Sequence, residues 1–358
     1  MQSLNAVSKS NRIEWIDTAK GIGILLVILG HLPGLGLIES IIYSFHVPLF
    51  FFLSGYVFKN TDPFPAFLKK KAKAILIPYV TLAAGVLIYN AVFSIINGNF
   101  AISSVLKQVL RFAVQRRYTS LWFLSCLFFL NLLFYAVSKI PKKWIRLVIC
   151  VALPIIGYCY YLFLAPHLPW NGAANLPGVG QIQSDPGLPW NVDICLMAIL
   201  FFYVGYLAKN AKAVDFLSKT KVRWILAFLG CAALNVGVWY LNRELGGSGL
   251  EMFDANYRFL PLTYLAAFFG IGATVLFSKA IKSKYLRYIG QNSLVYFAWH
   301  QTIAIPLSIQ ILKWSGYEAL QISSDWRGLI QFCMALAICT LLNLLFTKTK
   351  LRVCLGKF

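Results

Sequence analysis

A lysine and a histidine stand eleven residues apart in the apolar segment WIDTAKGIGILLVILGHLPGL, at Lys20 and His31. Eleven steps of about 100° bring two side chains of a helix to nearly the same azimuth, and the helical rise separates them by about 16 Å. A cation near one membrane surface and an imidazole near the other would therefore share one helix face. Because ionisable groups are costly in hydrocarbon, this pair is a first indication of a functional site.

Three of the four histidines lie in separate apolar segments, at His31, His46 and His300, and the fourth, His167, lies in a loop. A single buried histidine most often has a structural role. Three in one apolar chain favour acid–base chemistry, since each imidazole needs a polar partner or a wet cavity and titrates near neutral pH.

The chain around two of these histidines indicates interrupted helices. Pro48 lacks an N–H group and predicts irregular backbone near His46. Such backbone is tolerated at membrane depth where it is enclosed by protein or lines a water-filled cavity. Asn292 or Ser293 is expected to cap the inner end of the helix that carries His300.

The composition predicts an all-α fold, a polytopic membrane bundle of about ten transmembrane helices. Hydrophobic residues make up 59% of the chain and charged residues 13%, with a mean hydropathy of +0.69. Long apolar runs without strand-like alternation argue against a barrel. The expected spans are about 16–36, 37–58, 74–96, 119–138, 144–164, 192–208, 223–243, 259–280, 292–313 and 327–347.

The distribution of basic residues predicts the orientation. With the N-terminus inside, 25 of the 33 lysines and arginines fall in the N-terminal segment, the inner loops and the C-terminal tail. This bias predicts cytoplasmic tails at 1–15 and 348–358 flanking a membrane domain at 16–347. The net charge of +21 is then explained by orientation and attraction to anionic membrane lipids, not by nucleic acid. The first span carries charged groups and no evident cleavage site, so it is not expected to be a signal peptide.

The loop 165–191 is expected outside and is too rich in proline and glycine for a regular helix. It repeats the sequence LPWN, so that Trp170 and Trp190 each precede an asparagine. These tryptophans are candidates to stack on a sugar, and interfacial anchoring of a stiff connector is the alternative. Residues 97–118 have the spacing of an amphipathic helix on the outer surface.

Five segments in this order resemble the acyltransferase 3 family of integral membrane O-acyltransferases, especially its fucose-4-O-acetylase-like branch. They are RIEWIDTAKGIGILLVILGH, YSFHVPLFFFLSGYVF, LWFLSCLFF, FFYVGYLAKN and IGQNSLVYFAWH. The resemblance implies transfer of an acyl group, acetyl by default, from cytosolic acyl-CoA to a hydroxyl of a surface glycan or its lipid-linked precursor. It also implies residence in the bacterial cytoplasmic (inner) membrane.

The family's signature of a basic residue followed ten residues later by histidine matches Lys20 and His31. We expect Lys20 and Arg12 to bind the phosphates of acetyl-CoA, although lysine lacks the bidentate geometry of the arginine that many members carry. His31 is the expected general base, with His46 or His300 sharing that role or orienting the acceptor.

The expected oxyanion donors and pocket residues remain open. Tyr296, which lies four residues before His300, Ser54, and backbone freed by Pro48 are the candidate donors. Trp122 is either a pocket residue or an interfacial anchor. No metal is expected.

Two functional alternatives also remain open. Intramembrane histidines and a broken helix suit a proton-coupled transporter or flippase without acyl chemistry. A scaffold without chemistry is the other. Lys20 itself has a simpler reading as the partner of Asp17 in a helical ion pair.

Overall fold

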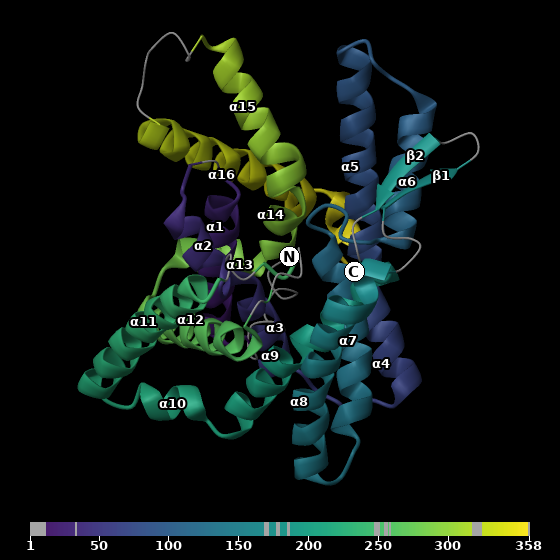
Figure 1. The fold of residues 1–358 in the computed structure, drawn as a ribbon. Helices are drawn as coiled ribbons and strands as arrows, with labels where there is room; N and C mark the ends of the chain where they lie inside the picture. The colour runs from purple at the N-terminus through teal and green to yellow at the C-terminus, as the bar shows by residue number, and fades with distance from the viewer. Residues whose placement is uncertain are drawn as a thin grey trace, which may run out of the picture.

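The computed structural model describes residues 12–32, 34–167, 172–176, 180–184, 187–246, 251–253, 257, 259–316 and 324–356. The described residues form a helical bundle (Figure 1). The helices of its first half are α1 (Glu14–Gly30), α2 (Leu37–Tyr43), α3 (His46–Tyr56), α4 (Phe64–Lys71), α5 (Ile77–Ile96), α6 (Ile102–Val114), α7 (Trp122–Ser138) and α8 (Lys143–Cys159). Those of its second half are α9 (Val192–Asn210), α10 (Ala213–Leu217), α11 (Lys221–Glu244), α12 (Leu260–Ala280), α13 (Lys284–Gln291), α14 (Ser293–Trp299), α15 (Ile305–Trp314) and α16 (Ser324–Lys348).

Seven helical stretches of the described chain are long and apolar enough to cross a membrane. These are Leu37–Tyr56, Phe64–Ile96, Lys143–His167, Pro189–Asn210, Lys221–Glu244, Leu260–Ala280 and Trp326–Lys348. Some of them join two helices of the list above, as Leu37–Tyr56 joins α2 and α3 and Phe64–Ile96 joins α4 and α5. The predicted spans 119–138, 16–36 and 292–313 also fall on helices, but α7 and α1 have only 17 residues each. The third is interrupted by a π-helical turn at His300–Ala304 between α14 and α15. The chain is therefore a helical membrane protein whose shorter helices lie around the site described below.

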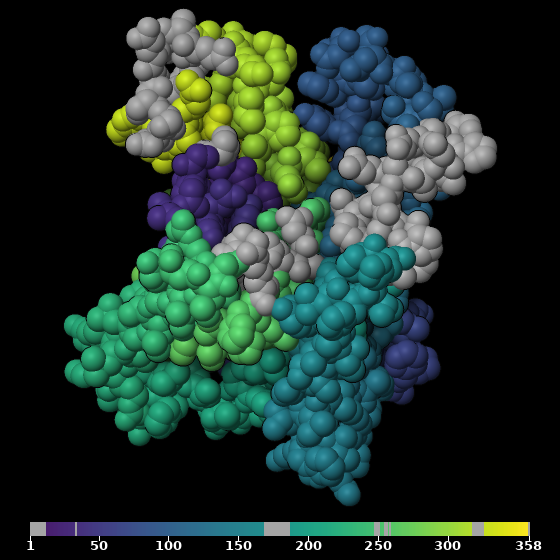
Figure 2. Space-filling view, viewed as in Figure 1, coloured from purple at the N-terminus to yellow at the C-terminus, as the bar shows by residue number. Residues whose placement is uncertain are grey.

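The interior helices are α1, α3, α9 and α14, with α11 and α12 on one side and α4 to α8 on the other (Figure 1). Glycines bring α3 and α9 into backbone contact. A Cβ atom on Gly55 would overlap the backbone of Phe202, and one on Gly205 would overlap that of Phe52. Small residues at such crossings allow close packing where no hydrophobic effect drives helix association. In the space-filling view, a furrow separates α15 from α5 (Figure 2).

The structure adds one element to the predicted all-α fold. Within the expected outer loop, β1 (Gly172–Leu176) and β2 (Gly180–Ser184) form an antiparallel hairpin, with Gly172 opposite Ser184. The proline- and glycine-rich sequence was correctly expected not to form a regular helix, but the hairpin was not foreseen. The expected amphipathic helix at 97–118 is present as α6.

A buried ion pair joins the segment before α7 to the start of α9. Arg117 Nη2 lies 2.8 Å from Asp193 Oδ2, and both side chains are almost inaccessible. Tyr161 also donates to this carboxylate, and the backbone N–H of Leu188 donates to its other oxygen. The backbone N–H of Arg117 donates to Asn191 Oδ1. These bonds secure a segment whose residues 115, 117 and 119 all have positive φ, a costly conformation for residues other than glycine.

We predict that Arg117→Met destabilises the protein by about 3–5 kcal/mol, because it leaves the Asp193 carboxylate buried without its cation. Lys70→Ala is the matched control, since the Lys70–Asp62 pair is largely exposed and its loss should cost at most about 1 kcal/mol. Thermal unfolding in detergent measures both. Equal melting temperatures for the two variants would contradict the assigned role of the buried pair.

Candidate active site

Three histidines that are far apart in the sequence line one cavity of about 190 Å³. His31 follows α1, His46 begins α3, and His300 begins the π-helical turn after α14. The ring centroids of His31 and His300 are 4.7 Å apart. The remaining lining residues are Val27, Tyr43, Val47, Ser120, Trp122, Glu251, Met252, Phe253, Phe297 and Gln301.

All three imidazoles have the same local hydrogen bond. Nδ1 lies 2.8 Å from the Val27 carbonyl in His31, 2.9 Å from that of Ile42 in His46, and 2.8 Å from that of Phe297 in His300. A carbonyl only accepts hydrogen bonds, so each Nδ1 must carry the proton. Each neutral ring therefore keeps the lone pair of Nε2, which is the atom needed to accept a proton from a hydroxyl.

These hydrogen bonds arise from interruptions in the helices. The carbonyls of the last turn of a helix have no partner within it. α1 ends at Gly30, and two residues, Ser44 and Phe45, separate the end of α2 from the start of α3. At His300 the helix widens into a π-turn, a feature often found at functional sites. In each case a histidine donates to a carbonyl three or four residues back, next to the break, and this bond orients the ring; the Ile42 carbonyl also accepts the backbone N–H of Phe45.

The interruption expected near Pro48 is confirmed, whereas the cap expected at Asn292 is not formed. Instead, the Asn292 amide donates to the carbonyl of Tyr288. The reason is that α13 ends one residue before α14 begins, so that Asn292 belongs to the end of one helix as much as to the start of the next.

Tyr43 was not singled out in the sequence, yet it lies between two of the histidines. Its ring stacks on His46 at 5.0 Å and meets His31 edge-on at 5.9 Å. Its hydroxyl donates to the carbonyl of Gly30 at 2.7 Å, which is the residue just before His31. A Cβ atom on Gly30 would lie 2.9 Å from Cε1 of this ring. Tyr43 therefore holds the end of α1 and the position of His31.

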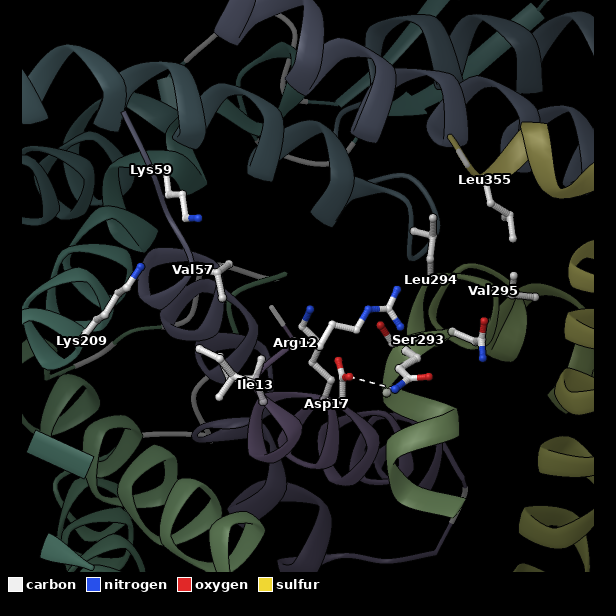
Figure 3. Close-up of a pocket in the computed structure, with 15 residues that line it drawn as sticks. Arg12, Ile13, Asp17, Val57, Lys59, Lys209, Ser293, Leu294, Val295 and Leu355 are labelled. Atoms are coloured by element: carbon white, nitrogen blue, oxygen red, sulfur yellow. Dashed lines mark hydrogen bonds between the residues drawn. The ribbon is translucent and has the colours of Figure 1, made fainter. Parts of the chain in front are cut away.

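A second cavity, of about 430 Å³, lies at the other end of α1. Among the described residues, four cations line it, namely Arg12, Lys20, Lys59 and Lys209, together with one carboxylate, Asp17. Figure 3 shows Lys59 and Lys209 entering this cavity from one side and Arg12 reaching into its centre. The excess of positive charge suits a ligand with several phosphates.

Asp17 does not form the expected ion pair with Lys20 among the described contacts. Its carboxylate accepts a hydrogen bond from Gln291 Nε2 at 3.0 Å (Figure 3). The neighbouring helix α13 also pairs with α1 through Arg287 and Glu14, whose charged atoms lie 2.5 Å apart. Because α13 takes up the acidic side chains of α1, Lys20 is left facing the cavity.

The other candidate residues lie at different places. Trp122 lines the histidine cavity and is buried. Tyr296 is fully buried and bonds to Thr340, away from that cavity. Ser54 bonds to the carbonyl of Phe50 between the two cavities. Trp190 is partly buried and packs between Tyr79 and Phe129 against the core. Trp170 and its neighbour Asn171 lie outside the described residues.

Lys59 and Lys209 were counted in the sequence only as inner-loop charges. Lys59 directly follows the expected span 37–58 and Lys209 the expected span 192–208, and Lys209 lies within one of the segments that carry the family resemblance. Their position next to the ends of expected spans is the feature of the sequence that could have indicated a role in the cationic cavity. Glu251 and Gln301 gave no comparable signal, because only the fold brings them to the histidines.

Comparison with known proteins is informative at the level of the family. A family profile described as an acyltransferase domain matches residues 13–348, nearly the whole chain. The chain belongs to the acyltransferase 3 family. No curated protein and no solved structure gives a significant match. The match supports membrane acyl transfer and gives no support to a transporter or scaffold without chemistry.

For this acyltransferase we predict that Tyr43→Phe lowers the acyl-transfer rate several-fold while the protein stays folded. The variant keeps the ring but leaves the Gly30 carbonyl without its donor, a loss worth about 1–3 kcal/mol. Tyr285→Phe is the control, since that ring is 84% exposed. Transfer rates and melting temperatures of both variants test this, and an unchanged rate for Tyr43→Phe would remove its positioning role.

Proposed function

We propose that this acyltransferase moves an acetyl group from cytosolic acetyl-CoA to a hydroxyl of a surface glycan or its lipid-linked precursor. The observation that carries the proposal is the pair of cavities on α1. One is lined by four cations, and the other is lined by three imidazoles whose Nε2 atoms are not used by the helix backbone. The resemblance to the fucose-4-O-acetylase-like branch favours a deoxyhexose hydroxyl as the acceptor.

The cationic cavity is the proposed site of the CoA phosphates, with Lys20 and Arg12 as the primary contacts and Lys59 and Lys209 in support. The basic-residue bias supports a cytoplasmic position for this cavity and for both chain termini, in a bacterial inner membrane. From Lys20 the histidines are about 16 Å away along the helix axis, a distance that an extended pantetheine arm can cover. The thioester would then reach the histidine cavity while the phosphates stay at the membrane surface.

His31 is the proposed general base. Its Nε2 takes the proton of the acceptor hydroxyl as the oxygen attacks the thioester carbonyl. Collapse of the tetrahedral intermediate breaks the carbon–sulfur bond, and the thiolate takes the proton back from His31 to leave as free CoA. The Nδ1 bond to Val27 keeps the ring oriented throughout.

His300 and His46 are proposed to assist this step. His300 Nε2 is buried without a hydrogen-bond partner among the described residues, so it can accept from the acceptor hydroxyl or from protonated His31. The Trp122 indole and the Gln301 amide line the same cavity and are the proposed donors to the oxyanion. Glu251, Met252 and Phe253 cover the cavity from the α11–α12 connection, the side from which we expect the acceptor.

We predict that His31→Gln lowers the transfer rate by about 10²–10⁴-fold, the usual contribution of a positioned general base. His167→Gln is the matched control, because that exposed histidine ends the Lys143–His167 helix and does not line the cavity. Release of CoA thiol and acetylation of a methyl fucoside by the purified protein measure the effect. Full activity of His31→Gln would disprove its role as the base.

We predict that Lys20→Ala weakens CoA binding by about tenfold or more, since a charge-assisted phosphate contact is worth about 1.5–3 kcal/mol. Lys70→Ala should leave the affinity unchanged, because its side chain is exposed and outside the cavity. Titration of CoA at two salt concentrations distinguishes the variants, and the affinity of Lys20→Ala should depend less on salt. Equal affinities would exclude Lys20 from the donor site.

Mass spectrometry of surface glycans from cells with and without the gene tests the acceptor class. The proposal requires the loss of one acetyl mass per modified unit in the deletion strain. Unchanged glycans together with intact thiol release in vitro would exclude the glycan and keep the acyltransferase.

A further inference from the structure

The two cavities are lined by the same three helices, which suggests a passage between them. α1 contributes Lys20 to the cationic cavity and Val27 to the histidine cavity. α14 contributes Leu294 to the first and Phe297 to the second. Helix α3 contributes Val47 to the histidine cavity, and Val57, which directly follows its last residue, lines the cationic one. A route for an acyl group between the two cavities would therefore run along α1, bordered by α3 and α14.

Phe50 of α3 lies against Gly23 of α1, and both residues belong to the stretches of these helices that separate the two cavities. A Cβ atom on Gly23 would lie 2.9 Å from Cζ of the Phe50 ring, 3.1 Å from its Cε2, and 3.1 Å from Cδ2 of Leu49. Gly23 is three residues after Lys20 and four before Val27, so it faces the space between the cavities. The ring thus fills the place that a side chain on α1 would otherwise take.

The surroundings of Phe50 differ from those of its chain neighbours. Leu49 and Phe51 are completely buried, whereas the ring of Phe50 keeps part of its surface accessible. Phe50 also contacts Phe123 edge-on at 6.1 Å, and Phe123 contacts Phe297 of the histidine cavity at 5.2 Å. One side of the ring is therefore packed against Gly23 and Phe123, while part of its surface stays accessible.

We propose that Phe50, seated on Gly23, is the constriction that selects which acyl groups reach the histidines. This rests on the proposed acyl-CoA function and adds a specificity-determining residue to it. A short acetyl group passes when the ring turns aside, and longer acyl groups are held back. The selection acts on the acyl chain alone, because the CoA phosphates stay in the cationic cavity.

Turnover of acetyl-CoA and butyryl-CoA by the purified protein, followed by thiol release with methyl fucoside present, tests the proposal. Phe50→Ala should raise the ratio of butyryl to acetyl turnover about tenfold or more, since each methylene excluded by a tight apolar site is worth roughly 10–200-fold. The ratio does not depend on how much of the protein is folded. Phe50→Leu, which preserves more packing, should give a smaller increase in the same direction.

Gly23→Ala should lower acetyl-CoA turnover about tenfold with unchanged CoA binding, because the added methyl group competes with the ring for one space. The double variant Gly23→Ala/Phe50→Ala should recover part of the turnover and keep the raised butyryl ratio, because it relieves the contact with Phe50 and leaves the one with Leu49 Cδ2. Gly237→Ala and Phe93→Ala are the controls. No atom lies within 4 Å of the Cβ position at Gly237, and Phe93 is 39% exposed on α5.

The outcomes separate this proposal from the proposed function. A wild-type butyryl-to-acetyl ratio in Phe50→Ala, with normal CoA binding, overturns the constriction and leaves the acyltransferase intact. Absence of thiol release by the wild-type protein with either acyl-CoA overturns the proposed donor, and the constriction with it.

Discussion

The site depends on one constraint, which is that a helix interrupted in hydrocarbon leaves carbonyl groups without a partner. Each unsatisfied carbonyl is costly where no water can reach it. At three such interruptions a histidine donates Nδ1–H to a carbonyl three or four residues back, and at Ile42 this bond adds to one from the backbone N–H of Phe45. Tyr43 does the same for Gly30 from a neighbouring helix. The bonds that make the broken helices tolerable therefore also fix the tautomer of every imidazole in the cavity.

Contacts with a neighbouring helix also determine which side chains face the cationic cavity. Helix α13 pairs with the acidic residues of α1, through Arg287 to Glu14 and Gln291 to Asp17. With its nearest carboxylate engaged elsewhere, Lys20 faces a cavity rich in positive charge. Neighbouring helices thus determine which polar groups of α1 are structural and which remain available to a ligand.

Rigid packing surrounds this site. The α3–α9 crossing brings backbones into contact through Gly55 and Gly205, and the buried Arg117–Asp193 pair holds the segment that leads into α7. Ser120 and Trp122 reach the histidine cavity from that segment. The hydrogen-bond network therefore stabilises the strained backbone at 115–119. It thereby also positions Ser120 and Trp122 in the wall of the histidine cavity.

The sequence by itself determined the helical membrane fold, the approximate spans and the break near His46, because apolar runs and proline act locally. It also indicated Lys20 and His31, whose spacing is a property of one helix. Only the tertiary structure decided that three distant histidines meet, that Tyr43 lies between two of them, and that Trp190 packs against Tyr79 at the edge of the core. Those contacts join helices far apart in the chain, and their register depends on glycine crossings and π-turns that periodicity does not encode.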